Sequence, residues 1–299
     1  MATLGQWVEG ARPRTLPAAV APVLLGTVVA GFELPGVVSA TRALLALVVA
    51  LALQVGVNYS NDYSDGIRGT DTVRVGPVRL VGQGLAAPER VRMAALLSFA
   101  VAAIAGLALV ALTGAWWLLL VGVAAIASAW LYTGGPRPYG YAGLGEVFVF
   151  VFFGVVATMG SAFVQTSRLT LLAAVASAGV GALACAILVA NNLRDIPGDT
   201  VVGKRTLAVR IGDAATRRLY TGLLVAAWAL VPVMAVLSTP WALLGLVSIP
   251  LGLAPARATL SGASGRDLIP VLIATGRLLL AYSVVMSIGL LVGATVSAA

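Results

Sequence analysis

The strongest constraint on the fold is a series of long apolar runs that fill most of this 299-residue sequence. A helix that spans the hydrocarbon core of a bilayer needs about 20 mostly apolar residues. Nine runs approach that length, at residues 15–32, 38–58, 92–112, 115–132, 145–165, 169–191, 217–237, 241–256 and 270–296. The sequence therefore predicts an all-α, polytopic membrane protein with about nine transmembrane helices, forming a single domain over residues 1–299.

The composition supports this prediction and excludes several classes of function. Only 10% of the residues are charged, whereas a soluble domain carries about 25%. The net charge of +8 does not indicate a nucleic-acid partner, because the basic residues lie between apolar runs and there orient helices in membrane lipid. The sequence contains no histidine, which excludes histidine acid–base catalysis and histidine-ligated zinc.

The distribution of charge predicts the orientation in the membrane. With the N-terminus in the cytoplasm, 17 of the 19 lysines and arginines fall on the cytoplasmic side, and only Arg42 and Arg168 fall on the other. Cytoplasmic loops carry such an excess of basic residues. In this orientation all acidic residues except Glu33 also lie on the cytoplasmic side. We therefore expect a multi-pass protein of the inner (plasma) membrane with its active site facing the cytoplasm.

Two polar segments, at 59–91 and 192–216, carry most of the remaining chemistry and resemble each other. Each begins where an apolar run ends, and each opens with asparagines followed by spaced aspartates. A helix that continues through such a cluster places residues three and four apart on one face. The members are Asn58, Asn61, Asp62 and Asp65 in the first cluster, and Asn191, Asn192, Asp195 and Asp199 in the second.

Carboxylates gathered on one helical face repel each other, and a hard divalent cation removes that repulsion. Mg²⁺ is commonly held by one or two carboxylates, with phosphate oxygens and waters completing its shell. Basic residues follow both clusters, as a metal-bound diphosphate requires. They are Arg68, Arg74 and Arg79 after the first, and Lys204 and Arg205 after the second. The two clusters together therefore predict a site for Mg²⁺ and a diphosphate.

These residues and several others resemble the UbiA superfamily of intramembrane prenyltransferases. Within it, the similarity is greatest to members that prenylate 1,4-dihydroxy-2-naphthoate. It runs through most of the chain, and the segments that carry it are Arg12-Pro-Arg14-Thr-Leu-Pro17, Asn61-Asp62-Tyr63-Ser-Asp65-Gly66, Gly76-Pro77-Val-Arg79-Leu80, Tyr132-Thr-Gly-Gly-Pro136, Leu144-Gly145-Glu146, Asn191-Asn192-Leu-Arg194-Asp195 and Gly203-Lys204-Arg205-Thr206-Leu207.

The resemblance implies helices around a central cavity and a polyprenyl diphosphate as the prenyl donor. It implies Mg²⁺ held by Asp62, Asp65, Asp195 and Asp199, and a diphosphate pocket completed by Asn58, Asn61, Asn192, Lys204, Arg137 and Tyr132. The implied reaction joins the prenyl group to 1,4-dihydroxy-2-naphthoate with loss of CO₂ and diphosphate, which gives demethylmenaquinol for menaquinone biosynthesis. Arg79 and Gln83 are candidates for holding the naphthoate carboxylate.

One departure from the family pattern limits the prediction. Many superfamily members place a further aspartate where this sequence has Gly69, and the next acid here is Asp71, whose role is left open. Alternatives are a related enzyme that uses hydroxybenzoate or a sugar phosphate as acceptor, or a secondary transporter. The transporter is less favoured, because ionisable residues of a transport path more often lie near the membrane midplane.

Overall fold

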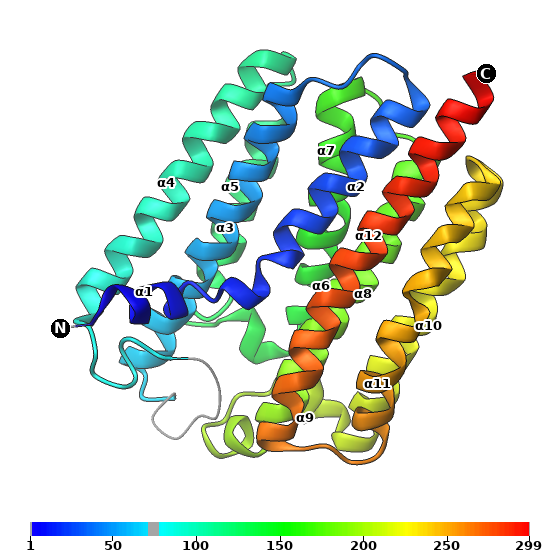
Figure 1. Ribbon diagram of the computed structural model, residues 1–299. Coiled ribbons are helices and arrows are strands. Elements are labelled where there is room, and N and C mark those ends of the chain that lie inside the picture. The colour runs from blue at the N-terminus through cyan, green and yellow to red at the C-terminus, as the bar shows by residue number, and fades with distance from the viewer. Residues whose placement is uncertain (1, 71–77, 299) are drawn as a thin grey trace.

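The computed structural model describes residues 2–70 and 78–298, and these residues form helices joined by short loops, without a β-strand (Figure 1). The longer helices run side by side in one bundle, while α1 crosses one end of it. The helices are α1 (Leu4–Gly10), α2 (Pro17–Glu33), α3 (Ala40–Ile67), α4 (Pro88–Thr113), α5 (Leu118–Leu131), α6 (Gly145–Val149), α7 (Ala157–Thr166), α8 (Leu171–Val201), α9 (Leu207–Ile211), α10 (Asp213–Leu237), α11 (Ile249–Leu260) and α12 (Leu268–Ala298).

The apolar helices confirm the prediction of a polytopic helical membrane protein. Among the described residues, seven helices are long and apolar enough to span a bilayer, or eight when the bent pair Leu4–Thr15 and Pro17–Glu33 counts as one span. The run predicted at 115–132 forms α5, which is a shorter apolar helix. The count of nine transmembrane helices and the cytoplasmic location of the N-terminus therefore stay predictions.

Helix α8 is the centre of the bundle. In its most apolar stretch 72% of the residues are buried, against at most 44% in the other spans. It packs against α2, α7, α10 and α12, and against the π-helical segment Phe150–Val156 that joins α6 to α7. Small residues allow these close approaches, because at Gly154 an added methyl group would meet the backbone of Gly181. Membrane helices commonly use small residues in this way.

Both aspartate clusters lie at the same end of the bundle, on helices rather than in loops. Helix α3 continues through its cluster to Ile67, and α8 continues through the second cluster to Val201. That end also carries α9 and the start of α12 (Figure 1). The polar segments 59–91 and 192–216 therefore open with helical turns, which fixes the spacing of their side chains. Asp71 and Arg74 lie outside the described residues.

The close approach of two glycines predicts a large effect of a small substitution. Gly154→Ala should lower the melting temperature of the detergent-solubilised protein, because overpacking a well-packed interior costs about 1–3 kcal/mol. Gly222→Ala is the matched control, since an added methyl group there meets nothing within 4 Å. The control should melt at the same or a higher temperature than the wild type, because alanine favours helix. Equal melting temperatures of the two variants would contradict the close packing at Gly154.

Candidate active site

The first cluster forms one buried face at the end of α3. Asn58, Asn61, Asp62 and Asp65 are all less than a tenth exposed. Asn61 accepts a hydrogen bond from the Thr133 hydroxyl (2.9 Å), in the loop after α5. The helix therefore presents these polar groups inward, toward other segments at the same end of the bundle.

The Asp62 carboxylate binds the backbone further along the same polar segment, at Leu80 and Val81. It accepts hydrogen bonds from the backbone N–H groups of Leu80 (2.7 Å) and Val81 (3.1 Å). Charge-assisted hydrogen bonds of this kind are stronger than neutral ones. The turn they hold positions Arg79, whose side chain is buried and lines the cavity described below.

Asp65 is the point at which three distant segments meet. Its Oδ1 accepts a hydrogen bond from the Tyr141 hydroxyl (2.7 Å) and lies 3.1 Å from Nζ of Lys204. The Lys204 ammonium also lies 4.6 Å from the centre of the Tyr141 ring. The N–H of Arg205 donates to the Tyr141 carbonyl oxygen (3.0 Å). The end of α3, the loop before α6 and the loop after α8 are thus joined around one carboxylate.

The Tyr141 hydroxyl is held as a donor. Burial, and after it the neighbouring Asp65 carboxylate, raise the pKa of Tyr141 above its ordinary value because both disfavour the phenolate. The phenol therefore stays protonated at neutral pH and can donate to Asp65.

In the second cluster Asn192, Asp195 and Asp199 are buried and Asn191 is half-buried, and the pairing differs from that of the first cluster. Arg194 donates two hydrogen bonds to the Asp195 carboxylate (2.7 and 2.8 Å) and one to Oδ1 of Asn191 (2.8 Å). Asn192 donates through Nδ2 to the Glu146 carboxylate (2.9 Å) on α6. The Asn192–Glu146 bond joins the last turns of α8 to the helix that begins the preceding span, whereas the bonds of Arg194 stay within α8.

Both clusters open into one cavity with a volume of about 760 Å³. Its walls come from the link between α1 and α2, from α3, α4, α5, the segment from α6 to α7, α8 and the start of α12. The structure brings eight of the predicted site residues together around it: Asn58, Asn61, Asp65, Arg79, Tyr132, Asn192, Asp199 and Lys204.

Four predicted residues do not line this cavity. Asp62 and Asp195 are buried beside it, each bonded to the groups described above. Arg137, between two prolines in the loop after α5, is exposed, and so is Gln83 in the turn before α4. Their side chains reach solvent at the end of the bundle and do not contact the enclosed space.

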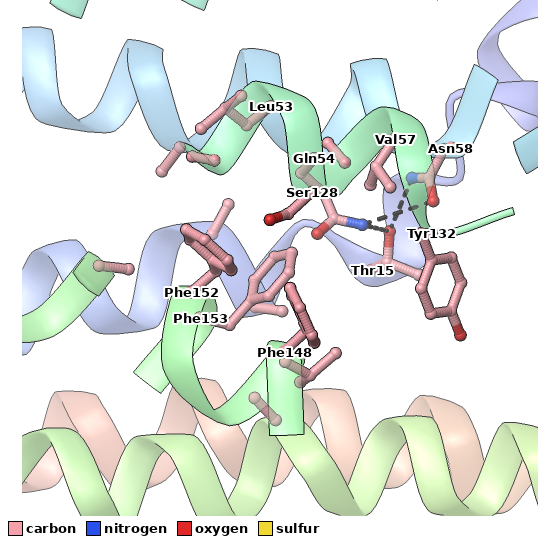
Figure 2. Close-up of a pocket in the computed structure, with 18 of the residues that line it drawn as sticks. Thr15, Leu53, Gln54, Val57, Asn58, Ser128, Tyr132, Phe148, Phe152 and Phe153 are labelled. Carbon is pink, nitrogen blue, oxygen red and sulfur yellow. Dashed lines mark hydrogen bonds between the residues drawn. The ribbon is translucent and has the colours of Figure 1, made fainter. Parts of the chain in front are cut away.

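The body of the cavity is apolar, and one wall is aromatic. Phe148, Phe152 and Phe153 point into it from α6 and the π-helical segment, opposite Leu53 of α3 (Figure 2). The ring of Phe148 stacks on Tyr139 with centroids 3.9 Å apart. π-Helical turns are rare and frequently lie at functional sites. Here the turn forms a flat apolar surface close to the polar end.

Sequence reasoning missed several polar residues at the site. Glu146 lies in a segment that carried the family resemblance and Tyr141 lies just before that segment, yet neither was assigned a contact. Thr15 and Gln54 also line the cavity and bond to each other (2.9 Å). The sequence did contain a signal that Gln54 belongs to the site, because it is a polar residue inside an apolar run and lies one helical turn before Asn58.

The oxygen-rich donor set fits Mg²⁺ when a diphosphate completes the site. Among the described residues no group of three or more acidic, cysteine or histidine side chains is close enough to hold a metal by itself. Mg²⁺ does not require such a group, since it takes one or two carboxylates together with phosphate oxygens and waters. Asp65 and Asp199 supply carboxylates at the cavity, and Lys204 already places a cation beside Asp65.

Comparison with known proteins shows the family to which this sequence belongs. The family model described as the UbiA prenyltransferase family matches residues 19–268. The 1,4-dihydroxy-2-naphthoate octaprenyltransferase of Mycobacterium tuberculosis is 55% identical over 287 residues, which cover 96% of this chain and 97% of the relative. The protein of the same name from Bacillus subtilis is 32% identical over 94% of this chain and 90% of the relative.

Solved structures show the same fold at low sequence identity. A UbiA homologue from Archaeoglobus fulgidus, bound to DMAPP and Mg²⁺, has a TM-score of 0.65 at 14% identity, covering 95% of this chain and 99% of that one. The apo structure of a UbiA homologue from Aeropyrum pernix K1 has a TM-score of 0.64 at 15% identity, covering 98% and 99%. By sequence match over most of its length, the chain belongs to the UbiA prenyltransferase family.

Proposed function

We propose that this protein is an Mg²⁺-dependent prenyltransferase that joins the prenyl group of a polyprenyl diphosphate to 1,4-dihydroxy-2-naphthoate. Diphosphate and CO₂ leave, and the product is demethylmenaquinol. The observation that carries the proposal is the meeting of both aspartate clusters at the polar end of one apolar cavity, around Asp65 and Lys204. The names of the relatives from M. tuberculosis and B. subtilis support the choice of acceptor.

In this proposal the polar end of the cavity binds the diphosphate. Mg²⁺, held by Asp62, Asp65, Asp195 and Asp199, would neutralise the leaving group, as electrostatic catalysis requires. Lys204 provides a cation at the cavity from the protein itself. The remaining members of the pocket would be Asn58, Asn61, Asn192, Arg137 and Tyr132, of which all but Arg137 line the cavity.

The apolar body of the cavity is where the allylic cation forms and reacts with the aromatic acceptor. The allylic C–O bond breaks with its electron pair going to the diphosphate, and the ring carbon that bears the carboxylate attacks the resulting cation. A C–C bond forms, and the C–CO₂ bond then breaks and returns its electrons to the ring. Walls such as Phe148 and Phe152 exclude water from the cation. Arg79, buried at the cavity, suits the acceptor carboxylate better than the exposed Gln83.

We also propose that this end of the bundle lies at the cytoplasmic side of the inner membrane. The excess of basic residues predicts that orientation. Both clusters lie at one end of the bundle, which supports a site that opens to a single aqueous compartment.

The acceptor is tested by turnover with purified protein in vesicles. With a radiolabelled polyprenyl diphosphate and Mg²⁺, 1,4-dihydroxy-2-naphthoate should give a prenylated product and one CO₂ for each product molecule. 4-Hydroxybenzoate and a sugar phosphate should give neither. Turnover of another acceptor, with none of 1,4-dihydroxy-2-naphthoate, would show that the proposed acceptor is wrong.

The role of the first cluster is tested by removing one charge. Asp65→Asn should lower kcat at least about 100-fold, because it removes a carboxylate that faces the cation site. Asp213→Asn is the control, since Asp213 is an exposed acid whose pair with Arg217 has little energetic weight. The control should keep near-normal turnover and both variants should elute as folded protein. Near-normal activity of Asp65→Asn would remove Asp65 from the proposed site.

The metal requirement is tested by chelation. EDTA should abolish turnover of the wild type, and added Mg²⁺ should restore it, because the diphosphate needs a cation to leave. Ca²⁺ at the same concentration should restore less, since it is larger and binds in looser geometry. Full turnover in excess EDTA would contradict a divalent cation in the reaction.

A further inference from the structure

Gln54 is a buried amide in the middle of α3 that presents one atom to the cavity. Gln54 is 6% exposed, and it lines the cavity opposite Phe148, Phe152 and Phe153 (Figure 2). Its Nε2 donates to Oγ1 of Thr15 (2.9 Å) and lies at hydrogen-bonding distance from Oδ1 of Asn58 (3.5 Å). Within the described part of the chain, its Oε1 accepts no hydrogen bond and points into the cavity.

The orientation of this amide follows from the groups behind it. Asn58 donates through Nδ2 to the carbonyl oxygen of Ala11 (2.9 Å), and the Thr15 hydroxyl donates to the carbonyl oxygen of Arg12 (2.9 Å). Carbonyl oxygens only accept. Asn58 must therefore turn Oδ1 toward Gln54, and Thr15 must offer its oxygen as an acceptor. Both neighbours then require the NH₂ group of Gln54, which leaves Oε1 for the cavity.

An acceptor atom fixed in an apolar cavity selects for a ligand that brings a donor. A prenyl chain has no N–H or O–H group, and an ionised diphosphate offers mainly acceptor oxygens. Neither half of the prenyl donor matches Gln54. A hydroxylated aromatic acceptor does match it, because its O–H can donate to Oε1 while its flat ring packs against Phe148 and Phe152. A buried acceptor left without a partner is costly.

We propose that Gln54 Oε1 accepts a hydrogen bond from a ring hydroxyl of the aromatic substrate, and that Gln54 with the facing Phe148 and Phe152 forms the acceptor subsite. The inference rests on the proposed function and adds the place and the recognition of its second substrate. In 1,4-dihydroxy-2-naphthoate the 1-hydroxyl is next to the carboxylate and donates to it. The 4-hydroxyl, on the opposite side of the ring, is therefore the group that reaches Gln54.

The spacing along α3 accommodates both substrates. Asp65 follows Gln54 by eleven positions, which is about 16 Å of helix axis at 1.5 Å per residue. A naphthoate bonded to Gln54 extends its carboxylate side toward the polar end. The remaining distance holds a reacting contact of about 3–3.5 Å and then the diphosphate beside Asp65. Thr15 and Asn58 line the cavity on the same side.

The test compares two ligands that differ only in the 4-hydroxyl, in proteins that differ only in the amide. Inhibition constants against 1,4-dihydroxy-2-naphthoate are measured for 4-hydroxy-2-naphthoate and 2-naphthoate, in the wild type and in Gln54→Met. The wild type should bind the hydroxylated compound about tenfold more tightly, as expected for one buried hydrogen bond. In Gln54→Met the ratio should fall to near one, the KM of the dihydroxy acceptor should rise, and the KM of the prenyl diphosphate should change little.

Gln165→Met is the matched control. Gln165 is also a buried glutamine, but it lies outside the cavity, and its amide is bonded at both ends to the backbone of Ser39 (2.9 and 3.2 Å). This variant should keep the tenfold ratio of the wild type, even if it melts at a lower temperature. Thr15→Val, which releases the amide of Gln54, should lower the ratio in the same direction as Gln54→Met.

Any of three outcomes would overturn the inference while leaving the proposed function intact. One is a wild type that turns over the dihydroxy acceptor yet binds both test compounds equally well, a result that needs no variant. The second is an unchanged ratio of inhibition constants in Gln54→Met, and the third is a rise in that variant of the KM for the prenyl diphosphate alone. If the wild type does not prenylate 1,4-dihydroxy-2-naphthoate at all, the proposed function itself fails.

Discussion

The arrangement of the site depends on the buried contact of Asp65 with Lys204 and Tyr141. A carboxylate at the end of a membrane helix, almost fully buried, is costly unless a cation or a donor faces it. Here the cation comes from the loop after α8 and the donor from the loop before α6. Satisfying one charge therefore requires three segments to meet, and their meeting closes the polar end of the cavity.

The cavity divides the chemistry between its two regions. Cations, amides and carboxylates gather at one end, where a highly charged leaving group needs them. Beyond them the walls are apolar and aromatic, which suits an isoprenoid tail and protects a carbocation from water. The chain of hydrogen bonds from Ala11 through Asn58 and Thr15 to Gln54 extends polarity from the polar end along the wall formed by α3. A ligand in this space thus meets a polar edge on one side and flat rings on the other.

The sequence predicted the helical membrane fold and most of the site because those features depend on local patterns. Length and hydropathy indicate spans, and the i, i+3 and i+4 spacing at Asn58, Asn61 and Asp65 indicates a shared face. Contacts between distant segments are not written in such patterns. Nothing local distinguishes Tyr141, which bonds to Asp65, from Arg137 in the same loop, which points to solvent. Likewise α5 is shorter than its apolar run, since the chain forms a turn at Trp116 and Trp117 and the helix extends only over Leu118–Leu131.

Asp62 and Asp65 show how one helical turn separates two roles for the same side chain. Both lie on the buried face of α3, and both belong to the same motif. Asp62 directs its two oxygens to backbone N–H groups of Leu80 and Val81, so its charge holds the turn that carries Arg79. Asp65 faces the cavity and Lys204, so its charge is available to a cation bound there. In the proposed mechanism, loss of Asp65 would lower turnover by removing a ligand of the bound cation, and loss of Asp62 would in addition release the turn that carries Arg79.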